Sequence, residues 1–305
     1  MLKDATDRYI ALRRTLGYKL VKTERHLRAF SDFAADRGEI HIRAATVLRW
    51  LETVAGTPNT RARRMSEIIL FARFLHAEDP RHEIPRADLP RSQARPVPYI
   101  YTPNEIARIL DAAGSLRHQK PNPLRRQLYV MLFGLIAATG LRVCEALGLK
   151  LCDIKPGGVL HIRETKFRKS RLVPLHATVV EALDRYLALR RQYASDSPWL
   201  FTSVQHREMC PTTVNYTFRC VLRAAGIAPE RRRQPRIHDL RHTFATRVLE
   251  QCGDERRAVA RHFIALSTYL GHVDVRNTYW YLETTPGMMA DIAMAAEMLV
   301  GESAT

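Results

Sequence analysis

Hydrophobic residues recur every three to four positions through the first 85 residues of the chain, which is the period of an amphipathic α-helix. Four helices are predicted, over about 5–16, 22–37, 44–54 and 59–76. Asn59 is the expected N-cap of the last helix, because its side chain can accept a backbone N–H hydrogen bond. The hydrophobic stripes of the first two helices consist of Tyr9, Leu12, Leu16, Leu27, Phe30 and Phe33. We therefore expect a helical domain over residues 1–85.

This pattern breaks between residues 86 and 98, where prolines are interspersed with arginines. Proline removes a backbone donor and fixes an extended backbone, so the segment is predicted to be a basic linker. Residues 99–305 would then form a second domain.

The second domain alternates long helical patterns with one short stretch of β character. Thr102 and Glu105 flank a proline at a predicted helix start, in the spacing of a capping box. Residues 159–174 resemble a β-hairpin with a basic, polar tip. Further helices are predicted over about 124–138, 178–192, 211–225, 238–250 and 286–300. The expected fold class is mostly α with a small β-sheet (α+β).

The basic composition of the chain predicts that it binds a polyanionic partner. The chain has 48 Lys and Arg residues against 31 Asp and Glu, which gives a net charge of +17. Nucleic acid is the first candidate, and a generally basic protein without such a partner is the alternative. Five cysteines without a C-x-x-C pair argue against a disulfide framework and a zinc cluster, and fit a cytoplasmic setting. The longest apolar run, 129–141, is too short to cross a membrane, and the N-terminus lacks an apolar signal core.

Several basic residues are candidates for contact with a DNA backbone. Three arginines stand at the start of the fourth predicted helix, where a positive charge opposes the helix dipole and a bound phosphate would offset that cost. The alternative is a solvated arginine-rich face. One candidate lies in the linker, and two lie near the predicted hairpin tip. They are Arg61, Arg63, Arg64, Arg95, Arg168 and Lys169.

Candidate chemistry is concentrated in four short motifs. Arg142 and Glu145 follow the tight turn at Gly140 and are three apart, so they can pair on one helical face. His238 and Arg241 have the same spacing, and His272 follows a Leu-Gly pair. Tyr279 and Tyr281 come next; on a helix they would point about 200° apart, so at most one can enter the same pocket. Each motif alone is also typical of a surface salt bridge or a polar helical face.

Taken together, these motifs resemble the tyrosine recombinases, also called the phage integrase family, from about residue 99 to 300. T-G-L-R-V-C-E-A-L-G-L at 139–149 is similar to the family's first arginine box, and H-D-L-R-H-T-F-A-T at 238–246 to its second. The third is L-G-H, ending at His272, and members carry the nucleophilic tyrosine nine residues later, which selects Tyr281. Lys166 precedes an R-x-V-P-L stretch, as the family's hairpin lysine does. The span from Arg241 to His272 is about eight residues longer than in compact members, and we expect the extra length within 252–263.

The resemblance implies a C-shaped clamp on DNA, with the first domain as core-binding domain, and a reaction without metal or other cofactor. Each site residue takes an expected role: Arg142 and Arg241 clamp the phosphate, Tyr281 attacks it, and His238 orients or deprotonates that tyrosine. Lys166 protonates the leaving 5′-oxygen, and His272 donates a hydrogen bond to the phosphate. Glu145 does not contact the DNA but holds Arg142 or His238 in position.

The partner implied is double-stranded DNA with core recombination sites, bound by a homo-tetramer whose free form is a monomer or weak dimer. The setting would be a mobile element in the bacterial cytoplasm, associated with the nucleoid. Two alternatives stay open. One is a type IB topoisomerase or telomere resolvase, which uses similar residues without paired sites. The other is a catalytically silent DNA-binding regulator.

Overall fold

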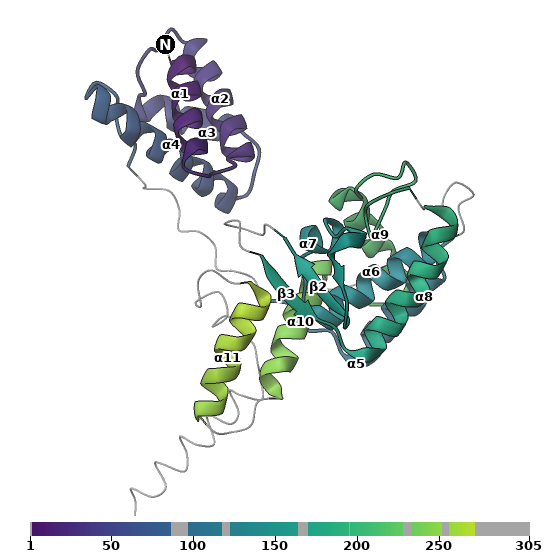
Figure 1. Ribbon diagram of the computed structural model, residues 1–305. Coiled ribbons are helices and arrows are strands. Elements are labelled where there is room, and N and C mark those ends of the chain that lie inside the picture. Colours follow the sequence, from purple (N-terminus) through teal and green to yellow (C-terminus); the bar gives the residue numbers. More distant parts are fainter. Residues whose placement is uncertain are drawn as a thin grey trace, which may run out of the picture. The chain divides into compact units, whose positions relative to one another are not determined.

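The computed structural model describes residues 2–86, 97–117, 123–163, 170–194, 196–227, 234–251 and 256–271, with the backbone alone for 256–260 (Figure 1). The chain divides into two compact units, residues 1–96 and 97–305, and the division falls in the proline-rich segment. The described part is mostly helical with one small sheet, so the expected fold class is confirmed.

The first unit contains the four predicted helices. They are α1 (Leu2–Thr15), α2 (Val21–Ala35), α3 (Ala44–Thr53) and α4 (Pro58–Glu78). Their apolar faces meet in one core in which Leu27, Phe30 and Phe71 are fully buried. Phe33 is partly buried against that core, so the stripe predicted for α2 is confirmed.

Two details of the first unit differ from the prediction. Leu12 and Leu16 are 46% and 65% exposed, because the buried face of α1 is confined to its first nine residues, from Leu2 to Ile10, and the last turn extends beyond the core. The N-cap of α4 is Thr57 rather than Asn59: the Thr57 hydroxyl accepts a 3.3 Å hydrogen bond from the Thr60 N–H. Proline at the next position favours this start, since its fixed φ suits the first helical residue.

The second unit packs its helices around an apolar core that includes most of α6. The helices are α5 (Pro103–Gly114), α6 (Arg125–Thr139), α7 (Val143–Leu147), α8 (Ala177–Tyr193), α9 (Pro211–Ala224), α10 (Ile237–Glu250) and α11 (Arg256–Leu270). Leu132, Phe133 and Ile136 of α6 are fully buried. Thr102 and Glu105 form the predicted capping box at the start of α5.

A three-stranded antiparallel sheet is inserted between α7 and α8. Its strands, β1 (Ile154–Lys155), β2 (Val159–Ile162) and β3 (Arg171–Pro174), lie in that order, with Ile162 opposite Arg171. The predicted hairpin strands are therefore present, and the residues of its tip, 164–169, lie outside the described part. The helix α11 was not predicted; it occupies most of the span in which we expected extra length.

Candidate active site

Four of the predicted catalytic and supporting residues lie in the part of the chain that the structure describes: Arg142, Glu145, His238 and Arg241. The three candidate DNA contacts of α4, Arg61, Arg63 and Arg64, lie in it as well. The remaining predicted positions lie outside it, and so does the predicted C-terminal helix. These positions are Arg95, Lys166, Arg168, Lys169, His272, Tyr279 and Tyr281.

The turn between α6 and α7 presents Arg142. Gly140 ends α6 in the left-handed conformation (φ +62°), which only glycine adopts without strain. Arg142 is the N-cap residue of α7, and its backbone N–H donates a 3.0 Å hydrogen bond to Oε2 of Glu145. Its Nη1 donates to Oε1 of the same carboxylate over 2.6 Å. The pairing expected from the three-residue spacing is thus confirmed, and Glu145 binds Arg142 through both backbone and side chain.

Arg171, at the start of β3, belongs to the same cluster. Its Nη1 and Nη2 donate to Oε1 and Oε2 of Glu145 over 3.2 and 2.7 Å. The Glu145 side chain is 8% exposed and that of Arg171 is 10% exposed. Burial raises the pKa of Glu145, but the two arginines outweigh it and hold that pKa at about 2. Glu145 is therefore a carboxylate at neutral pH, held between two guanidinium groups.

Arg241 lies in α10 and is almost completely buried, at 1% exposure. Its Nη1 donates to the carbonyl oxygen of Gly140 over 2.6 Å, and its Nη2 to that of Leu270 over 2.8 Å. One side chain therefore joins the turn that carries Arg142 to Leu270 at the end of α11, two residues before His272 in the sequence.

Three arginines bind three successive carbonyl oxygens at the end of α11. Arg171 Nε donates to Tyr269 over 2.7 Å, Arg241 to Leu270 over 2.8 Å, and Arg142 Nη2 to Gly271 over 3.4 Å. The last carbonyls of a helix have no intrahelical partner and carry the negative end of its dipole, so cationic donors are favourable there. We call Arg142, Arg171 and Arg241 the arginine cluster.

His238 stands at the start of α10, one turn before His242, whose ring centroid is 4.7 Å away. Burial, and then the charges of Arg241 and Arg236, lower the pKa of His238 to about 4. In the absence of a ligand its imidazole is therefore neutral at physiological pH, and one of its ring nitrogens is a hydrogen-bond acceptor.

The three candidate arginines of α4 are placed differently from one another. Arg61 and Arg63 are exposed, and Nε of Arg63 lies 3.8 Å from the Glu67 carboxylate. Arg64 is half-buried and donates to the carbonyl oxygen of Ala55 over 3.1 Å. Arg61 and Arg63 therefore face solvent more fully than Arg64.

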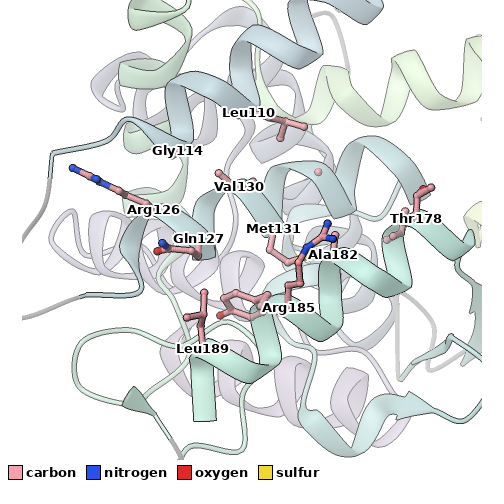
Figure 2. Close-up of a pocket in the computed structure, with 13 residues that line it drawn as sticks. Leu110, Gly114, Arg126, Gln127, Val130, Met131, Thr178, Ala182, Arg185 and Leu189 are labelled. Atoms are coloured by element: carbon pink, nitrogen blue, oxygen red, sulfur yellow. The ribbon is translucent and has the colours of Figure 1, made fainter. Parts of the chain in front are cut away.

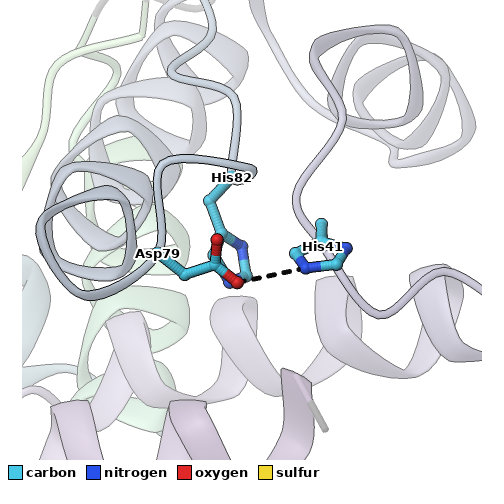
Figure 3. Close-up of side chains that lie close together, drawn as sticks. All are labelled: His41, Asp79 and His82. Atoms are coloured by element: carbon cyan, nitrogen blue, oxygen red, sulfur yellow. Dashed lines mark hydrogen bonds and ion pairs between the residues drawn. The ribbon is translucent and has the colours of Figure 1, made fainter.

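Among the described residues, one group of histidine and acidic side chains is close enough to hold a metal ion: His41, Asp79 and His82 (Figure 3). Nδ1 of His82 accepts the backbone N–H of Ile42 over 3.0 Å, which leaves the ring proton on Nε2. Asp79 accepts from His41 over 3.2 Å and is also bound by the guanidinium of Arg81. Asp79 is thus bound by His41 and Arg81, and His82 by the backbone of Ile42, so the group forms a polar joint between the start of α3 and the end of α4.

The second unit also has a groove of about 530 Å³ between α5, α6 and α8 (Figure 2). Leu110, Val130 and Met131 line it with apolar side chains, and Arg126 and Arg185 add charge. Its lining contains no member of the arginine cluster. Within the described residues, no helix is long and apolar enough to cross a membrane.

Comparison with known proteins identifies the family. The phage integrase family model matches residues 100–287. The protein called "Putative integrase/recombinase y4rB" of Sinorhizobium fredii is 39% identical over 298 residues, covering 95% of this chain and 95% of that protein. The tyrosine recombinase XerD of Brucella suis is 30% identical over 247 residues, covering 76% of this chain and 74% of that protein.

Solved structures show the same fold. The XerH site-specific recombinase bound to palindromic difH substrate has a TM-score of 0.66 at 20% identity, covering 89% of this chain and 78% of that one. A lambda integrase dimer bound to a COC′ core site has a TM-score of 0.64 at 20% identity, covering 90% of this chain and 96% of that one. The chain therefore belongs to the phage integrase family and is a tyrosine recombinase, an enzyme of the class that breaks and rejoins DNA strands.

Proposed function

We propose that the chain is a site-specific recombinase that cleaves double-stranded DNA by forming a 3′-phosphotyrosine bond to Tyr281. The observation that carries this proposal is the meeting of two predicted phosphate ligands, Arg142 and Arg241. Their guanidinium groups hydrogen-bond to the neighbouring carbonyls of Gly271 and Leu270. They therefore lie at the same end of α11, next in the chain to His272.

Two neighbouring guanidinium groups can stabilise a phosphodiester while a nucleophile attacks it. In-line displacement builds negative charge on the two non-bridging oxygens, and planar guanidinium forks bind such oxygens in pairs. A guanidinium has five N–H groups, so one arginine can hold a carbonyl on one side and a phosphate oxygen on another. Preorganised donors of this kind are typically worth roughly 10²–10³ in rate each.

We assign Tyr281 as the nucleophile from its spacing after His272. Its phenol loses a proton as the new phosphorus–oxygen bond forms, and the neutral imidazole of His238 is the proposed acceptor or orienting group. Tyr269, which precedes this segment, is a poor candidate because burial raises its pKa to about 12. His272 would add a hydrogen bond to the phosphate.

We assign Lys166 as the acid that protonates the departing 5′-oxygen. Attack by Tyr281 forms one phosphate ester bond as it breaks another, so the energy of the bond is kept. A free 5′-hydroxyl can then displace the tyrosine in the reverse sense, and joining needs no ATP. Glu145 would keep Arg142 in place from the side away from DNA.

We propose that the partner is double-stranded DNA carrying core recombination sites, and that both units bind it. Arg61, Arg63 and Arg64 of α4 would contact backbone phosphates, as would Arg95 between the units and Arg168 and Lys169 near the hairpin tip. Four copies on two sites would exchange strands in pairs. Integration or transposition of a mobile element in the bacterial cytoplasm, close to the nucleoid, would use such an activity.

The test is to trap the covalent intermediate. Full-length protein is incubated in EDTA, without ATP, with fragmented bacterial genomic DNA, and the reaction is stopped with detergent. We expect protein linked to DNA 3′ ends, with phosphotyrosine released on hydrolysis and one sequence enriched among the trapped fragments. A complete lack of adduct, or an adduct formed only with added divalent metal, would contradict the proposal.

The same material separates the two alternatives. A type IB topoisomerase would relax a supercoiled plasmid that lacks the enriched sequence, whereas a site-specific recombinase would not. A silent regulator would form no adduct, but affinity capture with the protein would still enrich one DNA sequence from the same fragments.

A further inference from the structure

Arg171 occupies a position that no assigned catalytic role covers. It is the first residue of β3, five residues after Lys166 in the chain, and its side chain is 10% exposed. Its guanidinium makes three hydrogen bonds: two to the Glu145 carboxylate and one to the carbonyl oxygen of Tyr269. All its nitrogens therefore bind the two segments that flank the proposed phosphate site.

The bond to Glu145 bears directly on Arg142. A single carboxylate serves both arginines: Oε1 accepts from Arg142 Nη1 and Arg171 Nη1, and Oε2 accepts from the Arg142 backbone N–H and Arg171 Nη2. A glutamate has three rotatable bonds, and Arg171 restrains them by binding both carboxylate oxygens. Without that second guanidinium, the carboxylate can follow Arg142 when a phosphate draws it away.

The bond to Tyr269 bears on the chain that leads to His272. Gly271 packs closely against Arg171: a Cβ added to this glycine would lie 2.9 Å from Nη1 of Arg171. Gly271 also has φ +66°, a conformation that favours glycine, and an added Cβ would displace the guanidinium of Arg171. The guanidinium of Arg171 thus lies directly against the last described residue before His272.

We propose that Arg171 is a positioning residue of this recombinase: it sets the orientation of Arg142 through Glu145, and the start of the His272 segment through the Tyr269 carbonyl. Its effect on cleavage rests on the proposed function, whereas its effect on the order of Arg142 does not. Lysine cannot replace it, because one ammonium group cannot bind both carboxylate oxygens in a plane and also reach a carbonyl.

The test compares Arg171→Lys with Arg163→Lys. Arg163 is a matched control because it adjoins the neighbouring strand β2 and pairs with a buried carboxylate, that of Asp153, outside the arginine cluster. The substrate is a duplex carrying the sequence enriched in wild-type adducts. We expect Arg171→Lys to slow single-turnover cleavage by roughly 10- to 100-fold with DNA affinity within about threefold, as for a misplaced catalytic group. Arg163→Lys should cleave at close to the wild-type rate.

A rate for Arg171→Lys within about twofold of wild type, at a temperature where the variant is folded, would overturn the proposal. A double-mutant cycle adds a readout that mere destabilisation would not move. Because Arg171 acts on Arg142 through Glu145, the Glu145→Gln/Arg171→Lys variant should cleave no more than about threefold slower than the slower single variant. Losses that multiply would contradict this route.

A measurement without DNA keeps the two proposals separate. Arginine side-chain NMR of the full-length wild-type protein should show hindered rotation of the Arg171 and Arg142 guanidinium groups. Arg171→Lys should free that of Arg142, and Arg163→Lys should not. Fast rotation of the Arg171 guanidinium in wild type would refute the positioning role even if the variants did not fold. Hindered rotation in a protein that forms no adduct would instead count against the proposed function alone.

Discussion

Nη1 of Arg241 donates a 2.6 Å hydrogen bond to the carbonyl oxygen of Gly140, 101 residues earlier in the chain. The two arginine motifs are therefore one structural unit, since the arginine of the second holds the turn that presents the arginine of the first. The bond is buried, and a buried carbonyl that loses its donor costs about 1–3 kcal/mol. The turn at Gly140 therefore contributes both to the stability of the second unit and to the position of Arg142.

Gly140→Ala should destabilise the second unit strongly. The substitution places a Cβ 2.5 Å from Cδ1 of Phe244 at a residue with φ +62°. Gly157→Ala is the matched control, since Gly157 has φ +77° and no atom within 4 Å of the added Cβ. Both carry the cost of a left-handed alanine, about 1–2 kcal/mol, and Gly140→Ala adds about 1–3 kcal/mol for overpacking. Urea unfolding would measure the difference, and equal losses would show that Phe244 yields without cost.

Tyr281→Phe should abolish the covalent adduct, because phenylalanine keeps the ring and removes the attacking oxygen. Tyr279→Phe is the control, and it should retain adduct formation. The measurement is gel retardation of labelled DNA by denatured protein. If Tyr279→Phe removed the adduct and Tyr281→Phe kept it, the assignment of the nucleophile would be reversed.

Lys166→Ala should cleave normal DNA slowly, since the 5′-oxygen would then leave without a proton donor. Cleavage should recover when sulfur replaces that oxygen, because a thiolate is a good leaving group without an acid. Single-turnover rates on the two substrates measure the effect. If sulfur restored no activity, Lys166 would have another role.

The second unit should lose stability as the pH is lowered, and His238 should account for part of that loss. Its folded-state pKa is lowered from 6.5 to about 4, so the unfolded chain takes up a proton first as the pH falls. This contribution is complete above about pH 6.5 and is lost between there and about pH 4. Between about pH 7.5 and 5, wild type should lose on the order of 1–2 kcal/mol more unfolding free energy than His238→Gln. Parallel losses in the two proteins would mean that the imidazole is not protected from protonation.

Local spacing was sufficient to predict some of these contacts. The pairing of Arg142 with Glu145 follows from a three-residue separation at a helix start, and the structure has it. The capping box at Thr102 and the two hairpin strands were predicted for the same reason, because each depends on residues close together in the sequence.

Contacts between distant segments were not predictable in this way. Arg171 entered the sequence analysis only as the unnumbered arginine of the R-x-V-P-L stretch. Its bonds to Glu145 and Tyr269 span 26 and 98 residues and depend on how β3 packs beside α7 and α11, so the sequence did not reveal them. The exposure of Leu12 and Leu16 likewise depends on where the core of the first unit ends, which a helical period does not show.

The arginine cluster recognises α11 through main-chain oxygens at residues 269–271, and every residue type carries that atom. Exchanging the side chain of Tyr269 or Leu270 would alter packing but leave the same acceptors in place. Adding or removing one residue within α11 would instead rotate its end by about 100° and turn those acceptors away from the guanidinium groups. This stretch should therefore tolerate changes of composition far better than changes of length.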